Sequence, residues 1–196
     1  MGKIFYILGK SATGKDTIYK KLLEDKSLNL KEIVLYTTRP IRDSETDGST
    51  YHFVSESDFL RLKEAGRVIE DRVYNTVHGP WRYFTVDDEN IDLEHNSYLV
   101  IGVLTSYVSI SNYFGEDKVV PLYIEVDDGE RLMRALLRER LPENGRYAEM
   151  CRRFLSDTED FSEEKIIAAG IKNRYENRNI DECIDVIKSV IVNNSR

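Results

Sequence analysis

The stretch KIFYILGKSATGKDT, residues 3–17, decides the fold. Its first six residues, Lys3–Leu8, are mostly apolar and β-prone, and a glycine follows them, which predicts a buried strand. The segment Gly9–Gly14 predicts a tight loop, because a glycine without a Cβ lets the backbone curl. A helical pattern opens at Lys15 and continues through Leu22. The stretch therefore predicts a strand, a glycine-bounded loop and a helix in direct succession.

The spacing Gly-x4-Gly-Lys between Gly9 and Lys15 is that of the phosphate-binding P-loop. In such a loop several backbone N–H groups converge on one point, and the positive end of the following helix adds to them. The lysine adds a full charge at a reach that suits β- and γ-phosphates. A glycine-rich turn of a Rossmann-like fold is the alternative. The residues expected to bind the phosphates of a nucleotide are Gly9, Lys10, Ser11, Ala12, Thr13, Gly14, Lys15, Asp16 and Thr17.

The position that usually holds the metal departs from the pattern. A P-loop carries Ser or Thr directly after its lysine, where the hydroxyl binds Mg²⁺. This chain has Asp16 there, and Thr17 one place later. We therefore predict Thr17 and Asp16 as the metal-binding residues, with Asp16 acting through a water.

Length and composition narrow the class of protein. A chain of 196 residues with 41% hydrophobic and 32% charged residues is typical of one globular domain. The net charge of −7 argues against non-specific nucleic-acid binding. Cys151 and Cys183 form neither a metal motif nor a disulfide framework. No apolar run approaches the roughly 18 residues of a membrane span, and no signal peptide fits the start. We expect a cytoplasmic protein that binds neither nucleic acid nor membrane.

Strands alternate with helices on both sides of a polar middle segment, which predicts an α/β fold with a parallel sheet covered on both faces. The segment 37–86 predicts a small, mostly β insertion. A helix that Asp127 or Asp128 caps is expected to carry leucines on one face. Its leucines are Leu132, Leu136 and Leu137. The other predicted helices span about 14–26, 55–65, 105–114, 146–157, 160–169 and 180–192. The predicted strands span 32–36, 51–54, 67–73, 83–86, 98–104 and 119–126, and a turn is expected over 78–81.

Three further motifs follow the P-loop: TTRPIR at 37–42, GSTYHF at 48–53 and IE at 69–70. In order and gaps they resemble the guanylate kinase family of P-loop nucleoside-monophosphate kinases. The resemblance implies a three-layer P-loop core over 1–36 and 97–196, a nucleoside-monophosphate-binding insertion over about 37–88, and a helical lid over about 138–155. It also implies transfer of the γ-phosphoryl group of ATP to GMP with Mg²⁺, by a monomer or a homodimer.

The same resemblance implies roles for individual residues. Arg39 and Arg42 match positions that hold the acceptor phosphate, where a planar guanidinium grips two oxygens. Tyr51 matches a further phosphate contact. Glu70 matches the carboxylate that accepts hydrogen bonds from the N1–H and amine of guanine. His78 falls in a turn that carries more contacts to this substrate.

The lid is expected to supply arginines that bridge the two phosphates being joined, because positioned charge does most of the catalysis in phosphoryl transfer. The candidates are Arg138, Arg140, Arg152 and Arg153. Arg140 aligns best, and Arg152 or Arg153 is the second. The predicted catalytic set is Lys15, Arg39, Arg140 and Arg152.

Three departures from the family pattern leave other functions open. Leu35 or Tyr36 stands where the family has a serine that touches guanine. His78-Gly79-Pro80 replaces Tyr-Gly-Ser, and the strand at Val100–Val103 lacks an Asp-x-Asp. Each lost hydrogen bond lowers base discrimination by about 1–3 kcal/mol. A nucleoside-monophosphate kinase with altered base preference and a catalytically silent binding module are therefore the alternatives.

Overall fold

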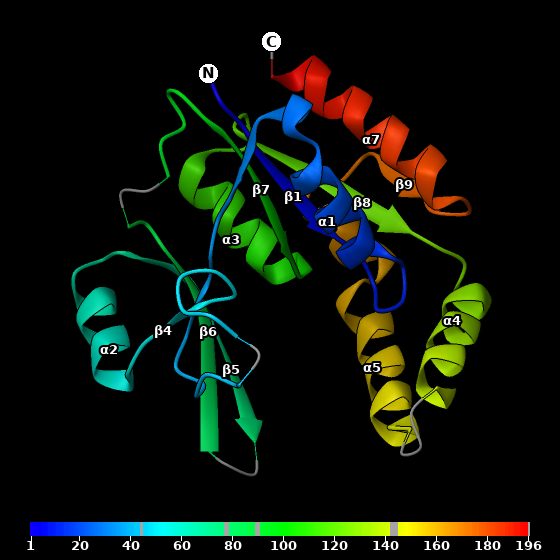
Figure 1. The fold of residues 1–196 in the computed structure, drawn as a ribbon, viewed down its shortest axis with the longest axis horizontal. Coiled ribbons are helices and arrows are strands. Elements are labelled where there is room, and N and C mark those ends of the chain that lie inside the picture. The colour runs from blue at the N-terminus through cyan, green and yellow to red at the C-terminus, as the bar shows by residue number, and fades with distance from the viewer. Residues whose placement is uncertain (44, 77–78, 89–90, 142–144, 196) are drawn as a thin grey trace.

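The computed structural model describes residues 1–43, 45–76, 79–88, 91–141 and 145–195. A central sheet carries two arms that extend from it on the same side (Figure 1). The elements in chain order are β1 (Ile4–Leu8), α1 (Lys15–Glu24), the 3₁₀ helix η1 (Lys26–Leu28), β2 (Leu30–Glu32), β3 (Tyr36–Thr37), β4 (His52–Phe53), α2 (Glu56–Glu64), β5 (Val68–Thr76), β6 (Gly79–Val86), β7 (Ser97–Gly102), α3 (Leu104–Phe114), β8 (Val119–Glu125), α4 (Asp128–Arg140), α5 (Tyr147–Asp160), α6 (Glu163–Ala168), β9 (Arg174–Glu176) and α7 (Ile180–Asn194).

The central sheet has the strand order β2-β7-β1-β8-β9, and all its pairs are parallel. Successive side chains of β1 point to opposite faces, as strand geometry requires. Tyr6 and Leu8 join the apolar core on the face that α3 and α6 cover. Phe5 and Ile7 join the core beneath α1 and α7. Both faces are buried, which confirms the predicted three-layer α/β fold.

A second sheet, of order β4-β3-β6-β5, forms one arm together with α2. Its own small core includes Phe59 of α2 and Phe84 and Val86 of β6, all nearly inaccessible to solvent. Helix α2 begins with a capping box, since Ser55 and Asp58 each bond the other's backbone N–H. The other arm consists of α4 and α5.

Two predicted elements in the first half of the chain are wrong. The expected strand over Glu32–Tyr36 is divided, because Glu32 ends β2 in the central sheet whereas Tyr36 begins β3 in the second sheet. The described part of the predicted turn, Gly79–Trp81, lies in β6 and pairs with β5. Pro80 is tolerated there because the described pairing of β3 with β6 is at Tyr83 and Phe84. The N–H that Pro80 lacks therefore leaves no hydrogen bond to β3 unmade.

Two further differences concern the second half of the chain. Leu132 and Leu137 are exposed, and the buried residues of α4 are Arg131 and Ala135. The helix thus turns Arg131 and Ala135 inward, and most of its leucine face lies at the surface. Strand β9 was not expected. In the described part of the chain, no helix is both apolar enough and long enough for a membrane crossing.

Candidate functional site

The loop between β1 and α1 has a backbone that demands glycine at its end. Gly14 has φ 85°, and a Cβ there would lie 2.6 Å from the side-chain nitrogen of Asn177. That amide donates a 2.8 Å hydrogen bond to the carbonyl of Thr13, so Asn177, just after β9, fixes the loop. Helix α1 begins at Lys15 without a side-chain cap, which leaves N–H groups of its first turn open to an anion.

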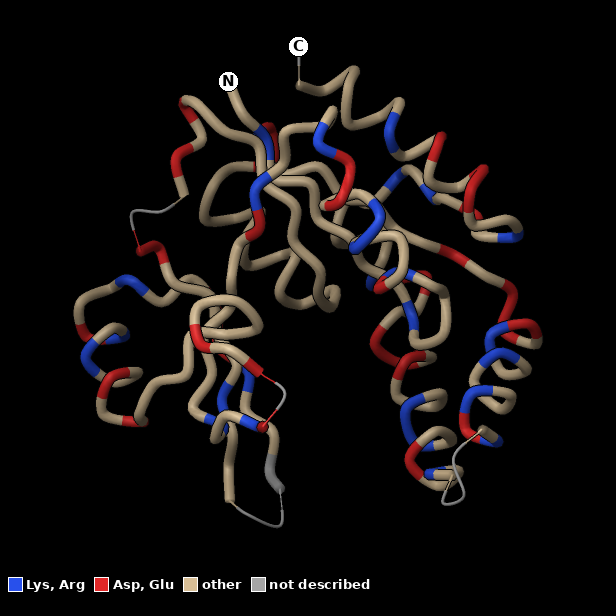
Figure 2. Tube along the Cα trace, viewed as in Figure 1, with Lys and Arg blue, Asp and Glu red and all other residues tan. Residues whose placement is uncertain are grey.

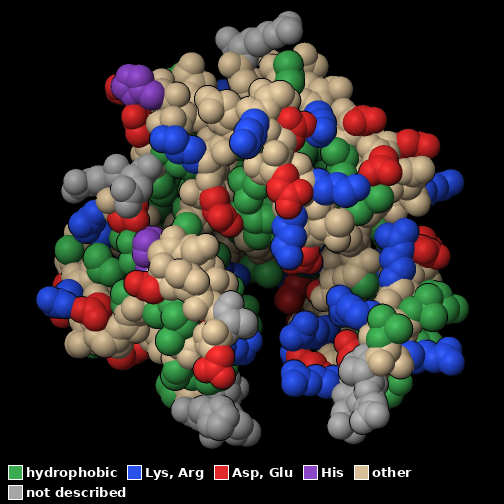
Figure 3. All heavy atoms as spheres, in the orientation of Figure 1, with side chains coloured by type: hydrophobic (Ala, Val, Ile, Leu, Met, Phe, Trp, Pro, Cys, Tyr) green, Lys and Arg blue, Asp and Glu red, His purple; other side chains and the backbone are tan. Residues whose placement is uncertain are grey.

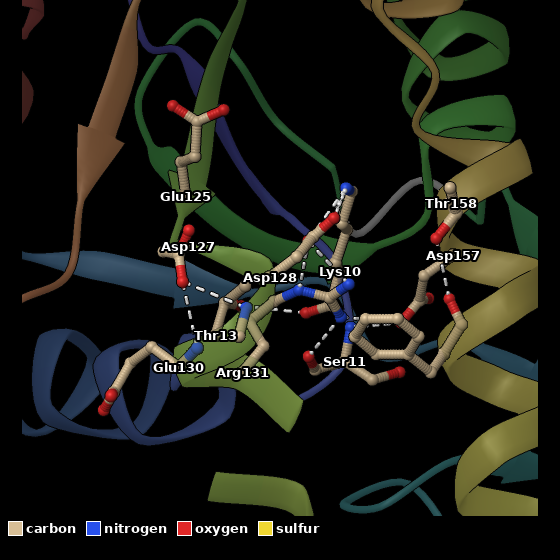
Figure 4. A network of polar contacts seen from close by, with 12 residues as sticks. Lys10, Ser11, Thr13, Glu125, Asp127, Asp128, Glu130, Arg131, Asp157 and Thr158 are labelled. Atoms are coloured by element: carbon tan, nitrogen blue, oxygen red, sulfur yellow. Dashed lines mark hydrogen bonds and ion pairs between the residues drawn. The ribbon is translucent and has the colours of Figure 1, made fainter. Parts of the chain in front are cut away.

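Two carboxylates and a buried arginine hold the middle of the same loop (Figure 4). The backbone N–H of Ser11 donates to Asp157 of α5 at 2.7 Å. Arg131, whose side chain is only 1% exposed, donates to the Ser11 carbonyl at 3.0 Å and lies 3.3 Å from Asp157. Asp128 accepts from both Arg131 and Lys10. Burial alone would raise the pKa of Asp128, but these hydrogen bonds from Arg131 and Lys10 hold it below its usual value.

The residues expected at the phosphates and the metal lie at the start of α1. The ammonium of Lys15 lies 3.8 Å from Asp16 Oδ2, and the side chain of Lys15 is 18% exposed. Asp16 and Thr17 are exposed. Ala12 has φ 64°, a left-handed conformation that side chains disfavour. Thr13 is buried, and its hydroxyl donates to the carbonyl of Lys10 at 2.9 Å.

Two cavities border the loop on the side of β8 and β9. One, of about 390 Å³, is lined by Lys10, Thr13, Asp127 and Arg178 among others. The second, of about 400 Å³, includes Arg134, Asn177 and Arg178 in its wall. Polar and charged groups therefore surround a space next to the phosphate loop that is large enough for part of a nucleotide.

In the other arm, Glu45 brings the predicted phosphate-binding residues together. Its two oxygens accept hydrogen bonds of 2.8 Å from the two terminal nitrogens of Arg39, and the backbone N–H of Arg42 donates to it at 2.9 Å. Arg39 also donates from Nε to the hydroxyl of Tyr83 at 3.1 Å, and its Cζ lies 5.6 Å from the ring centre of Tyr51. The hydrogen bonds from Arg39 lower the pKa of Glu45 to about 2.

Glu45 was missed in the sequence, where it is one acid in a polar segment. Arg39 is 3% exposed, and most of its N–H groups donate hydrogen bonds to acceptors within the arm. Arg42 is exposed. The structure therefore gives Arg39 a positioning contact and leaves Arg42 accessible.

Glu70 lies at the base of the same arm and is held by three donors. Its carboxylate accepts from the hydroxyls of Thr85 at 2.8 Å and Ser106 at 3.0 Å, and from Nε of Arg72 at 3.2 Å. Its side chain is 5% exposed.

The hydroxyl of Tyr6 fills the space beside Gly102, at the end of β7. A Cβ built on Gly102 would lie 2.0 Å from that hydroxyl, so the two positions exclude each other's larger side chains. The hydroxyl lies 3.5 Å from the carbonyl of Val103. Burial raises the pKa of Tyr6 far above its usual value, so the phenol stays neutral. The hydroxyl of a tyrosine from β1 therefore lies beside the end of β7, the strand in which the resemblance implies acidic residues.

The candidate lid arginines are exposed. Arg140 ends α4, and Arg152 and Arg153 of α5 both bind Glu149, at 2.7 Å and 2.9 Å. Arg138 lies 3.7 Å from Glu139. His78 lies outside the described residues.

Basic residues recur along the lower halves of α4 and α5 (Figure 2). The surface is hollowed between the two arms, and Lys and Arg side chains gather on the α4–α5 side of the hollow (Figure 3). The structure thus groups Arg39, Arg42 and Tyr51 on one arm and the lid arginines on the other.

Comparisons with known proteins find similarity to guanylate kinases by sequence and by structure. Residues 1–80 match the family model described as Guanylate kinase. The chain is 27% identical to a guanylate kinase of Porphyromonas gingivalis over 97% of each chain. It is 32% identical to a guanylate kinase of Anaplasma phagocytophilum over 71% of this chain and 65% of the relative. A crystal structure of guanylate kinase from Anaplasma phagocytophilum matches with a TM-score of 0.68 and 22% identity, covering 99% of this chain and 86% of that chain.

Proposed function

Because this chain belongs to the guanylate kinase family, we propose that it is an enzyme that transfers the γ-phosphoryl group of ATP to GMP, giving ADP and GDP. The observation that carries the proposal is the presence of two sites suited to phosphate in one molecule. An uncapped helix start with Lys15 lies in the core, and the Arg39–Arg42–Tyr51 group lies on the arm that the second sheet forms.

The loop Gly9–Thr17 is proposed to hold the triphosphate. Its open N–H groups and Lys15 would bind the β- and γ-phosphates, because both supply positive potential at one point. The adenosine would extend into the cavity lined by Arg134, Asn177 and Arg178, which adjoins the loop.

The second nucleotide is proposed to bind on the other arm. Arg42 and Tyr51 would contact its phosphate, and Arg39, held by Glu45, would position them and add charge. Glu70 would accept from the base. Closure of the arms would bring Arg140 and Arg152 or Arg153 to the phosphates and exclude water, which otherwise competes for the γ-phosphoryl group. Arg152 and Arg153 would exchange Glu149 for phosphate oxygens.

The residues at this site fit Mg²⁺ only when it binds together with the phosphates of the nucleotide. Among the described residues, no group of three or more His, Cys, Asp or Glu side chains could hold a metal alone. Mg²⁺ commonly takes one or two protein ligands together with phosphates and waters. The exposed oxygens of Thr17 and Asp16 offer that donor set. Bound there, the metal would neutralise charge on the transferring group.

One observation favours the second candidate function, a nucleoside-monophosphate kinase with altered base preference. No carboxylate lies on Val100–Val103, and Tyr6 fills the space beside Gly102. The acceptor base is therefore read by a changed set of groups. Location in the cytoplasm and the monomeric or dimeric state stay predictions.

The test is an ADP-release assay with ATP and Mg²⁺ against GMP, dGMP, AMP, CMP and UMP in turn. Turnover with guanine nucleotides alone supports the proposal, and preference for another acceptor supports the second candidate. No turnover with any acceptor contradicts both. Lys15→Ala should abolish the activity, whereas Lys21→Ala on the same helix, whose partner is the exposed Asp181, should retain it.

A further inference from the structure

A second charged residue accompanies Glu70 on the same face of β5. Arg72 lies two residues further along the strand, so both side chains point to one side of the sheet. Nε of Arg72 donates to Glu70 Oε2 at 3.2 Å, and the two side chains are 20% and 5% exposed. Glu70 and Arg72 therefore form one largely buried pair of an acceptor and a donor.

Arg72 has donors to spare. Within the described part of the chain, its hydrogen bond to Glu70 uses Nε, and no bond from either terminal nitrogen is present. Arg72 lines a cavity of about 310 Å³ together with Val73, Tyr74, Val103, Leu104, Thr105 and Asp160. This cavity lies between β5 and the start of α3. A guanidinium with unused donors at the wall of a cavity is suited to bind an acceptor on a ligand.

Glu70, by contrast, has little capacity left. An ionised carboxylate offers about four lone-pair sites. Thr85, Ser106 and Arg72 already occupy three of them. Glu70 therefore has room for about one further N–H donor, and one hydrogen bond alone discriminates weakly between bases. Firm recognition of one base therefore needs a second polar group beside Glu70.

The hydrogen-bonding edge of guanine supplies the matching pattern. Its O6 is an acceptor, and the adjacent N1–H is a donor. A neighbouring carboxylate and guanidinium match this order, whereas adenine presents an amine donor beside an N1 acceptor. We infer that Arg72 is a specificity-determining residue that donates to O6 of the acceptor base while Glu70 accepts from N1–H. The inference rests on the proposed function and deepens it.

The experiment compares GMP with 6-thioguanosine 5′-monophosphate, which keeps the N1–H and the amine of GMP but has sulfur, a weaker acceptor, in place of O6. The quantity measured is the ratio of the two kcat/KM values, in the wild type and in Arg72→Met. Weakening a hydrogen bond from a charged donor predicts a wild-type ratio of about 10-fold in favour of GMP. Arg72→Met should lower that ratio to within about threefold of one. Any loss of support for Glu70 affects both substrates and cancels in the ratio.

Arg61→Met is the matched control, because Arg61 is an exposed arginine of the same arm that pairs with Asp58. It should leave the ratio at the wild-type value. Arg72→Lys and Arg72→Gln, which each keep an N–H donor, provide second variants if the methionine variant folds poorly, and each should retain part of the ratio. A ratio that stays at the wild-type value in Arg72→Met overturns the inference, as does a wild-type ratio near one.

Failure of the proposed kinase function gives a different result from failure of the inference about Arg72. A wild-type protein that turns over neither nucleotide contradicts the kinase proposal. In that case equilibrium dialysis of GMP and of 6-thioguanosine 5′-monophosphate gives the same ratio as dissociation constants. Loss of the preference for GMP in Arg72→Met would then support the inference, and an unchanged preference would overturn it.

Discussion

The carboxylate of Asp157 accepts a 2.7 Å hydrogen bond from the backbone N–H of Ser11. This bond joins α5, the helix that carries Arg152 and Arg153, to the loop proposed to hold the triphosphate. Arg131 binds the carbonyl of the same serine. Both backbone polar groups of Ser11 are therefore held by the α4–α5 arm, so the position of that arm and the shape of the loop are coupled.

Removing Asp157 should destabilise the protein. Arg131 is 1% exposed and would lose one of its two carboxylate partners, and breaking a buried ion pair typically costs about 3–5 kcal/mol. We expect Asp157→Ala to lower the free energy of unfolding by about 3 kcal/mol, measured by urea denaturation. Glu130→Ala, which removes the exposed partner of Arg134, should cost less than about 1 kcal/mol. Equal effects of the two substitutions would contradict a structural role for the Ser11–Asp157–Arg131 contacts.

Glu45 should make the stability of the protein depend on acidic pH. Its pKa is lowered from an ordinary value of 4.5 to about 2 by Arg39, so its folded form binds protons less readily than its unfolded form. The stabilisation is therefore fully present above the unfolded pKa and is lost as the pH falls from about 5 towards 2. Urea midpoints of Glu45→Gln should vary less over this range than those of the wild type. The control, exposed Glu64→Gln, should follow the wild type, and parallel curves for Glu45→Gln would exclude the effect.

Ala12→Gly should relieve a strained backbone. Ala12 has φ 64°, and the left-handed conformation costs a side chain about 1–2 kcal/mol. Glycine removes this strain but gains about 0.4–1 kcal/mol of freedom in the unfolded chain. We expect a net stabilisation of about 0.5 kcal/mol by chemical denaturation. Gly66→Ala tests the reverse change at φ 70°, where nothing within 4 Å would meet the new methyl group, and should destabilise. A stability loss in Ala12→Gly would show that the strain is absent.

Glu70→Gln should impair use of GMP. Glutamine presents one acceptor and one donor in place of two acceptors, so it cannot accept from Thr85, Ser106 and Arg72 and still receive N1–H. We expect kcat/KM for GMP to fall by about 10- to 100-fold. Asp71→Asn changes the neighbouring acid of β5, which pairs with Lys63 and Arg82 instead, and should leave the value within about threefold. A similar small change in Glu70→Gln would remove Glu70 from the base site.

The sequence predicted the elements that have strong local patterns. The strand, loop and helix of residues 3–17 and the final helix over about 180–192 all occur as expected. Strand β9 was missed because three residues carry almost no periodicity. The division of 32–36 was missed because a local pattern does not say which sheet a strand joins.

Buried charges were the other source of error. Arginine is rarely buried unless it is paired, and one of the two partners of Arg131, Asp157, lies 26 residues away in the chain. Likewise, Glu45 becomes recognisable only once Arg39 and Arg42 are seen to converge on it. Pairings of this kind depend on how helices and loops pack, which composition and spacing do not encode.

The central claim is that the phosphate loop and the Arg39–Arg42–Tyr51 group bind two nucleotides that face each other. Equilibrium binding of a single molecule in which adenosine and guanosine are joined through five phosphates measures this directly. Linking the two ligands should make it bind at least about 100-fold more tightly than ATP or GMP alone. Lys15→Ala and Arg42→Ala should each weaken it. Binding no tighter than that of ATP, and insensitive to Arg42→Ala, would contradict the claim.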